Sequence, residues 1–199
     1  MEEREISPEE SLKIIERMLA GTRNRFYYNG FHFLFWGTLI ILGCILQYFM
    51  EAAGYESKTK YIWLFTIYLS PVYTIFCFWY YSRFYPKRKK ASPLDYIHGM
   101  LWGAFGISCF VLVFIAIQLK IFMPPFLFTM MGLCMFASGA IFKFRWLYIG
   151  AVVFWLGAIA GAALKDGSIS LLITAATMFL GYIIPGYLLW RKAKKEAHV

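Results

Sequence analysis

Six long apolar blocks constrain the fold of this chain more than any other feature of its sequence. Each block is long enough to supply the roughly 20 helical residues that a hydrocarbon layer about 30 Å thick requires. The blocks cover residues 31–50, 61–81, 97–119, 121–142, 146–164 and 169–190. Because a segment in lipid must pair its backbone polar groups internally, the sequence predicts an all-α integral membrane protein, a six-transmembrane-helix bundle.

The composition is typical of this class. Of the 199 residues, 60% are hydrophobic and 16% are charged, whereas soluble proteins have roughly 45–50% apolar and about 25% charged residues. The formal net charge of +9 raises nucleic acid as a partner. However, the basic residues crowd the ends of the blocks, and no nucleic-acid-binding motif accompanies them. We therefore expect the lipid bilayer, and no nucleic acid, as a partner.

The distribution of Lys and Arg predicts the orientation of the chain. With the N-terminus in the cytoplasm, sixteen of the twenty Lys and Arg residues lie on the cytoplasmic side and four on the other, as the positive-inside rule requires. The start of the chain is acidic and polar, and no apolar block precedes Phe31, so we expect no cleavable signal peptide. Both termini, including a basic tail of residues 191–199, are predicted to be cytoplasmic.

An internal pattern links the odd-numbered blocks. The spacing His-x-x-x-Trp-Gly begins at His32 in the first block and again at His98 in the third, and Arg145 holds the corresponding place in the fifth. The glycines that end this pattern are Gly37, Gly103 and Gly150. Parallel repeats of helices occur in membrane proteins, so one interpretation is three parallel helical hairpins. The other is chance recurrence in helices rich in Trp and Gly.

Two pairs of glycines have the spacing of a helix-packing motif. Gly99 and Gly103 lie four residues apart in the third block, and so do Gly157 and Gly161 in the fifth. Small residues at this spacing let helix backbones approach closely in lipid. The stripes predict close packing, either within the bundle or on the face of a homo-oligomer.

Two prolines interrupt predicted spans. Pro71 lies in the middle of the second span and Pro185 near the end of the sixth. Each removes a helical hydrogen bond and bends or locally opens its helix. Such a break frames a binding site in some transporters, and in many membrane helices it is a tolerated kink. We expect kinks.

Residues 1–30 are predicted to hold a short amphipathic helix and its lead-in to the first span. Ser7, Pro8 and Glu10 have the arrangement of a helix start with a capping box. Leu12, Ile15 and Leu19 fall on one face of that helix. A helix this short is not stable alone, so it must dock on the inner surface of the bundle, on lipid headgroups or on a partner protein.

The predicted spans contain no Asp, Glu, Lys or Arg away from their ends, which disfavours a coupled transporter. No catalytic motif is present, and the four cysteines lie in four different blocks without a CxxC pair. We expect no catalytic residues, no metal and no cofactor. The exception to weigh is a possible ligand-binding group of His32, Asp95 and His98 near the inner face. Asp95 and His98 are three residues apart and can share a helix face; alternatively, these residues sit at headgroup depth without a chemical role.

The chain resembles a family of small, uncharacterised six-span inner-membrane proteins from Gram-negative anaerobic gut bacteria. The likeness covers most of the chain. It is carried by Glu-Glu-Ser-Leu-Lys-Ile-Ile-Glu-Arg (9–17), by Asn-Gly (29–30) leading to Phe-Leu-Phe-Trp-Gly (33–37), and by Gly-Tyr-Ile-Ile-Pro-Gly-Tyr-Leu-Leu (181–189). Tyr187 stands where the family has His. The resemblance implies the bacterial inner (cytoplasmic) membrane as the location and implies no activity, cofactor or catalytic residue.

Three hypotheses about function remain. The first is a non-enzymatic multi-pass membrane protein that contacts a cytoplasmic partner through its N-terminal helix and basic loops. The second is a transporter or binder of an apolar or lipid-like small molecule, because kinked helices rich in Gly and aromatic residues can hold such a ligand without charge. The third is a membrane enzyme at the inner headgroup layer that uses Asp95 and His98.

Overall fold

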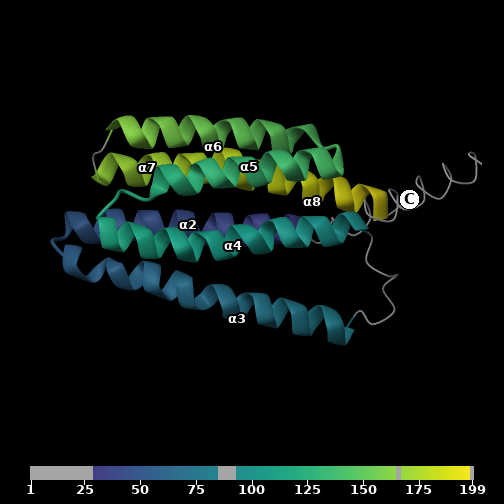
Figure 1. The fold of residues 1–199 in the computed structure, drawn as a ribbon, viewed down its shortest axis with the longest axis horizontal. Coiled ribbons are helices and arrows are strands. Elements are labelled where there is room, and N and C mark those ends of the chain that lie inside the picture. The colour runs from purple at the N-terminus through teal and green to yellow at the C-terminus, as the bar shows by residue number, and fades with distance from the viewer. Residues whose placement is uncertain (1–28, 85–92, 165–166, 198–199) are drawn as a thin grey trace, which may run out of the picture.

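In the computed structural model, residues 29–84, 93–164 and 167–197 are described, and they form helices and turns without a β-strand. Six helical segments follow one another, and each runs antiparallel to the one before it (Figure 1). They are α2 (Asn29–Ala52), α3 (Lys60–Phe84), α4 (Pro93–Leu119), α5 (Pro124–Phe142), α6 (Arg145–Leu164) and a last segment made of α7 (Gly167–Met178), η2 (Phe179–Ile183) and α8 (Ile184–Ala197). A short 3-10 helix, η1 (Glu56–Lys58), joins α2 to α3. The predicted amphipathic helix of residues 7–20 lies outside the described residues.

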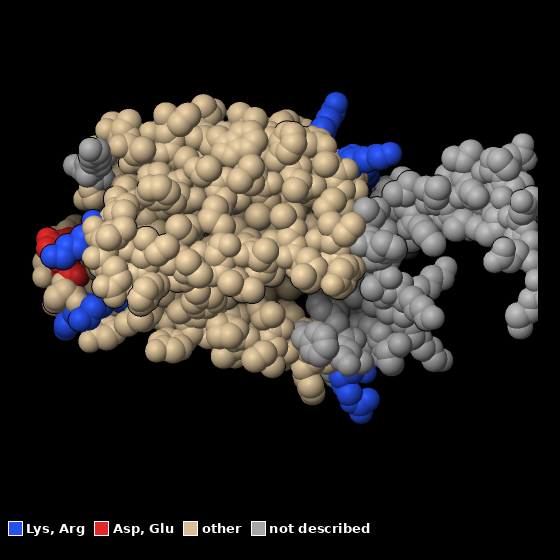
Figure 2. All heavy atoms as spheres, viewed as in Figure 1, with Lys and Arg blue, Asp and Glu red and all other residues tan. Residues whose placement is uncertain are grey.

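Several of these helices are suited to cross a membrane. Five stretches are long and apolar enough: His32–Ala52, Tyr96–Leu119, Pro124–Phe142, Arg145–Leu164 and Gly167–Lys192. The sixth long helix, α3, has 25 residues. The Lys, Arg, Asp and Glu side chains visible in Figure 2 gather at the two ends of the bundle, and the belt between the ends is uncharged. The protein is therefore an all-helical chain with the architecture of a multi-pass membrane protein.

The ends of the helices follow local sequence signals. Lys120 has a φ of 51° and closes α4, and Pro124 then begins α5, as the fixed φ of proline favours at a first helical position. Lys143, with a φ of 49°, ends α5 in the left-handed conformation, and α6 begins two residues later. The C-terminal segment differs from the expectation in one respect, because α8 continues to Ala197. Residues 191–197 of the predicted tail thus prolong the last helix.

The last predicted span contains a π-helical segment, η2, which the sequence did not predict. Pro185 follows this segment as the second residue of α8. Proline has no N–H to donate to the carbonyl oxygen four residues earlier, which here belongs to Gly181. The backbone N–H of Ile184 bonds the carbonyl oxygen of Phe179, five residues back. At the other predicted kink, Pro71, α3 runs without a break from Lys60 to Phe84.

The buried core comes from α2, α5, α6 and the last helical segment, while α3 and α4 lie at the periphery. Its members are Phe33, Phe128, Met135, Phe144, Leu147, Ala151, Phe154, Ala158, Met178, Tyr182 and Leu189. From α4, Trp102 packs against this core. Helix α3 is held to α2 near η1, where Nε1 of Trp63 donates to Oε1 of Gln47 over 2.5 Å. It diverges from α4 toward the end where the C-terminus lies (Figure 1).

The glycines of the internal pattern lie in different surroundings. A Cβ added to Gly37 would come within 2.7 Å of the Ile183 side chain, and one added to Gly150 within 2.5 Å of the Gly181 carbonyl oxygen. Both glycines therefore let their helices approach the last helical segment closely. Gly103 has nothing within 4 Å. The shared spacing thus supports close packing in α2 and α6 and has no such role in α4.

The predicted packing pairs divide in the same way. Gly157 is buried against Thr177 of α7, and Gly161 is buried with Pro125 of α5 at 3.8 Å from its added Cβ. Gly99 and Gly103 are exposed, and within the described ranges no atom lies within 4 Å of an added Cβ at either. The pair in α6 therefore lies inside the bundle, whereas the pair in α4 lies on its outer surface.

Candidate functional site

A polar cluster joins α4 to α5 beside the core. The indole Nε1 of Trp102 donates to Nε2 of His98, one helical turn earlier, over 2.8 Å, and to Oγ of Ser138 on α5 over 3.2 Å. The rings of His98 and Phe142 meet edge to face at 4.8 Å. His98 and Ser138 are both buried. Such buried polar groups need partners, and this cluster provides them while fixing α4 on α5.

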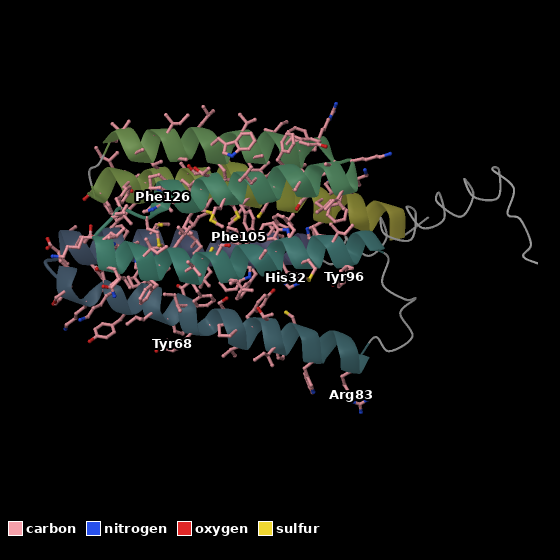
Figure 3. The ribbon with its side chains drawn as sticks, viewed as in Figure 1. His32, Tyr68, Arg83, Tyr96, Phe105 and Phe126 are labelled. Atoms are coloured by element: carbon pink, nitrogen blue, oxygen red, sulfur yellow. The ribbon has the colours of Figure 1, made fainter. Side chains whose placement is uncertain are left out.

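The other histidine of the predicted group belongs to a separate contact. The hydroxyl of Tyr73 on α3 lies 2.8 Å from Nδ1 of His32 on α2, which is a hydrogen bond between the two helices. The Tyr73 ring stacks on Phe35 at 4.1 Å and meets Trp36 edge to face at 5.5 Å. In the view of Figure 3, His32 is labelled between the ribbons of α3 and α4. This contact holds the middle of α3 against α2.

The described contacts do not bring His32, Asp95 and His98 together. His32 reaches α3, whereas His98 reaches α5. Asp95 lies in the first turn of α4, and its side chain is outside the described part of the chain. Among the described residues no three His, Cys, Asp or Glu side chains could share a metal ion. A shared site of these three residues stays a prediction.

Tyr182 is the polar residue of the core that sequence reasoning missed. It lies in η2 and is 4% exposed, with its ring 4.7 Å from Phe33, 6.2 Å from Trp102 and 6.1 Å from Phe154. Within the described ranges its hydroxyl has no hydrogen-bond partner. Desolvating a hydroxyl without a partner costs about 1–3 kcal/mol, and π-helical segments are frequent at functional sites. Tyr182 is thus a candidate hydrogen-bonding group inside the bundle.

One face of α7 adds three further buried hydroxyls, from Ser170, Thr174 and Thr177. Their spacing of four and three residues puts them in line along the helix. This spacing was visible in the sequence and was the signal that could have identified an interior face. In a membrane protein small hydroxyl residues mark helix–helix contacts, and α7 lies against α2 and α6.

The end of the bundle at which α2 begins is basic. Lys143 and Arg145 flank the α5–α6 turn, and Arg191 and Lys192 lie on α8; all four side chains are exposed. The Lys192 ammonium lies 5.4 Å from the centre of the Phe144 ring, which brings α8 to that turn. None of the four forms an ion pair with another described residue. Four exposed cations, none paired with a described carboxylate, therefore lie at this end.

Comparisons of the chain with protein-family models, with curated proteins and with solved structures find no match. What the protein does is therefore inferred from the chemistry of its own residues.

Proposed function

We propose that the protein is a non-enzymatic, six-span, multi-pass protein of the bacterial inner membrane that contacts a cytoplasmic protein through its N-terminal segment and basic loops. In this proposal both termini are cytoplasmic, and α3 is the sixth crossing. The observation that carries the proposal is the charge difference between the two ends. One end presents the exposed side chains of Arg83 and of the four cations described above, with Asp95 and Glu196 on α4 and α8 as the acidic residues of its helices, whereas the other end holds Glu51 and Glu56 beside its lysines. Basic residues favour the cytoplasmic side.

The interior favours a structural role over catalysis. Two polar contacts there join helices, one between Trp102 and Ser138 of α4 and α5 and one between Tyr73 and His32 of α3 and α2. Hydrogen bonds of this kind join helices in lipid. On the described outer surface, the cations of the basic end are exposed and have no described ion pair, and an acidic protein surface is the partner that they suit.

Removing residues 2–20 tests this proposal. With a reporter fused after Val199, the shortened chain should insert normally with its reporter in the cytoplasm, while the protein recruited to the membrane by the full chain is lost from the membrane fraction. A control in which residues 2–20 are replaced by a Gly/Ser segment of equal length should behave like the deletion. Recruitment that persists in both would contradict the partner contact, and a periplasmic reporter would contradict the orientation.

A second candidate function is supported by the Tyr182 hydroxyl. An apolar molecule that carries a carbonyl or hydroxyl oxygen could accept its hydrogen bond among the rings of Phe33, Trp102 and Phe154. We expect solvent extracts of gently purified protein to contain one such compound at a stoichiometry that Tyr182→Phe lowers. Mass spectrometry of the two extracts measures this. Spectra that show the same bulk lipids for both proteins would exclude the second candidate.

A further inference from the structure

We propose that residues 2–20 dock in cis across the basic end of the bundle, so that the acidic N-terminal segment covers Lys143, Arg145, Arg191 and Lys192 when no partner is bound. The proposal goes beyond the partner contact, because it concerns the isolated chain and holds for either orientation in the membrane. Three observations carry it: the charge of the segment, the free cations at the end of the bundle, and the place where the segment joins the bundle.

The N-terminal segment concentrates negative charge. Six of the eleven Asp and Glu residues of the whole chain fall within its first sixteen positions: Glu2, Glu3, Glu5, Glu9, Glu10 and Glu16. Residues 2–20 also hold three basic residues, Arg4, Lys13 and Arg17, so the segment carries a formal net charge of −3. Anionic lipid headgroups repel an acidic segment, so the lipid surface is a poor docking place for it. A surface of unpaired cations attracts it.

The basic end is complementary to this charge. The α5–α6 turn places Lys143 and Arg145 on either side of Phe144, and Lys192 lies over the ring of that phenylalanine. The cations of the turn and of α8 thus form one surface, and each is exposed and without an ion pair to another described residue. Exposed apolar side chains of the same end, Trp146 and Tyr187, are available to the apolar face of the predicted helix.

The segment joins the bundle beside this surface. Gly30, at the start of α2, packs against Trp190: a Cβ added to it would lie 3.0 Å from the Trp190 Cβ. Arg191 is the next residue along α8. The link of residues 21–28 can span up to about 26–29 Å when extended, and a helix over residues 7–20 is about 21 Å long. The chain therefore leaves α2 next to its docking surface and is long enough to cross it.

Docking of this kind is reversible and can be regulated. Exposed ion pairs contribute little individually and are screened by salt, so a partner with a stronger acidic surface can displace the segment. A partner must then bind the basic end more strongly than residues 2–20 do, because both bind the same basic surface.

Photocrosslinking tests the proposal on the full chain without a partner. With p-benzoyl-phenylalanine in place of Ser11, the purified protein in nanodiscs of phosphatidylcholine should crosslink within one chain to residues 143–146 and 187–192. Reversal of the cations (Lys143→Glu, Arg145→Glu, Arg191→Glu and Lys192→Glu) should lower that yield about tenfold, and exchange of the six glutamates for lysine in the same variant should restore it. About 1 M NaCl, where the screening length falls to roughly 3 Å, should lower the yield of the unchanged chain.

The matched control reverses charge at the opposite end, with Lys58→Glu, Lys60→Glu and Lys120→Glu, and should leave the yield unchanged. Crosslinks found only on lipid, only on a second copy of the chain, or on the basic end but insensitive to charge reversal and to salt would each overturn the cis contact. The salt measurement needs no variant, so it decides the question even if a charge-reversed chain fails to fold. Because no partner protein is in the sample, a negative crosslinking result does not contradict the recruitment proposed above.

Discussion

Gly150→Ala is expected to lower the stability of the bundle by roughly 1–3 kcal/mol, the range that overpacking of a core costs. The new Cβ would lie 2.5 Å from the carbonyl oxygen of Gly181 and 2.9 Å from the Met135 side chain. A flexible side chain can move away, but the oxygen belongs to the backbone of η2. The contact is reciprocal, since a Cβ on Gly181 would lie 3.2 Å from the carbonyl oxygen of Gly150.

The matched control is Gly103→Ala, at the corresponding position of the internal pattern. An added Cβ there meets nothing within 4 Å, and alanine is a better helix former than glycine by about 1 kcal/mol. Stability should therefore be unchanged or slightly higher. Denaturation of both variants in the same detergent, followed by circular dichroism, measures the difference. Equal effects at the two positions would mean that the close approach of α6 to η2 does not hold the bundle together.

This comparison also shows where the sequence limits prediction of the fold. The six helical segments were predicted from the length of their apolar blocks. The π-helical turn before Pro185 was not, because a proline near the end of a span is compatible with a simple kink as well as with a shifted hydrogen-bond register. The hydrogen bond from the backbone N–H of Ile184 to the carbonyl oxygen of Phe179, five residues back, distinguishes the two.

The candidate site was less predictable for a physical reason. In a soluble helix the apolar stripe marks the buried face, but in a membrane helix both the lipid face and the interior are apolar. Helix α4 illustrates this, since its glycines face outward while Trp102 faces the core. The spacing of His98 and Trp102 allowed a contact on one helix face. The partner on α5, Ser138, depends on how two helices meet, and nothing in the sequence near it identified the pairing.

Replacing Trp102 should separate its hydrogen bonds from its packing. Trp102→Phe keeps most of the ring contacts but removes the N–H that serves Nε2 of His98 and Oγ of Ser138. Leaving these buried acceptors without that donor should cost roughly 1–3 kcal/mol, with the bond between helices contributing about 0.6–1.7 kcal/mol of it. Trp102→Ala also removes the contacts with Phe33 and Tyr182, and the total should reach about 3–5 kcal/mol.

Trp155→Phe is the matched control, because its Nε1 reaches the backbone carbonyl of Thr129 over 3.4 Å at an exposed position. Its effect on the unfolding free energy should be a small fraction of that of Trp102→Phe.

In a double-mutant cycle, Ser138→Ala should cost less in the Trp102→Phe background than alone, since the donor to its hydroxyl is already gone. If the effects of Trp102→Phe and Ser138→Ala on the unfolding free energy were additive, Trp102 would stabilise the bundle only through the packing of its ring. The attachment of α4 would then rest on apolar contact alone, and the buried His98 and Ser138 would have to be stabilised by groups other than this indole.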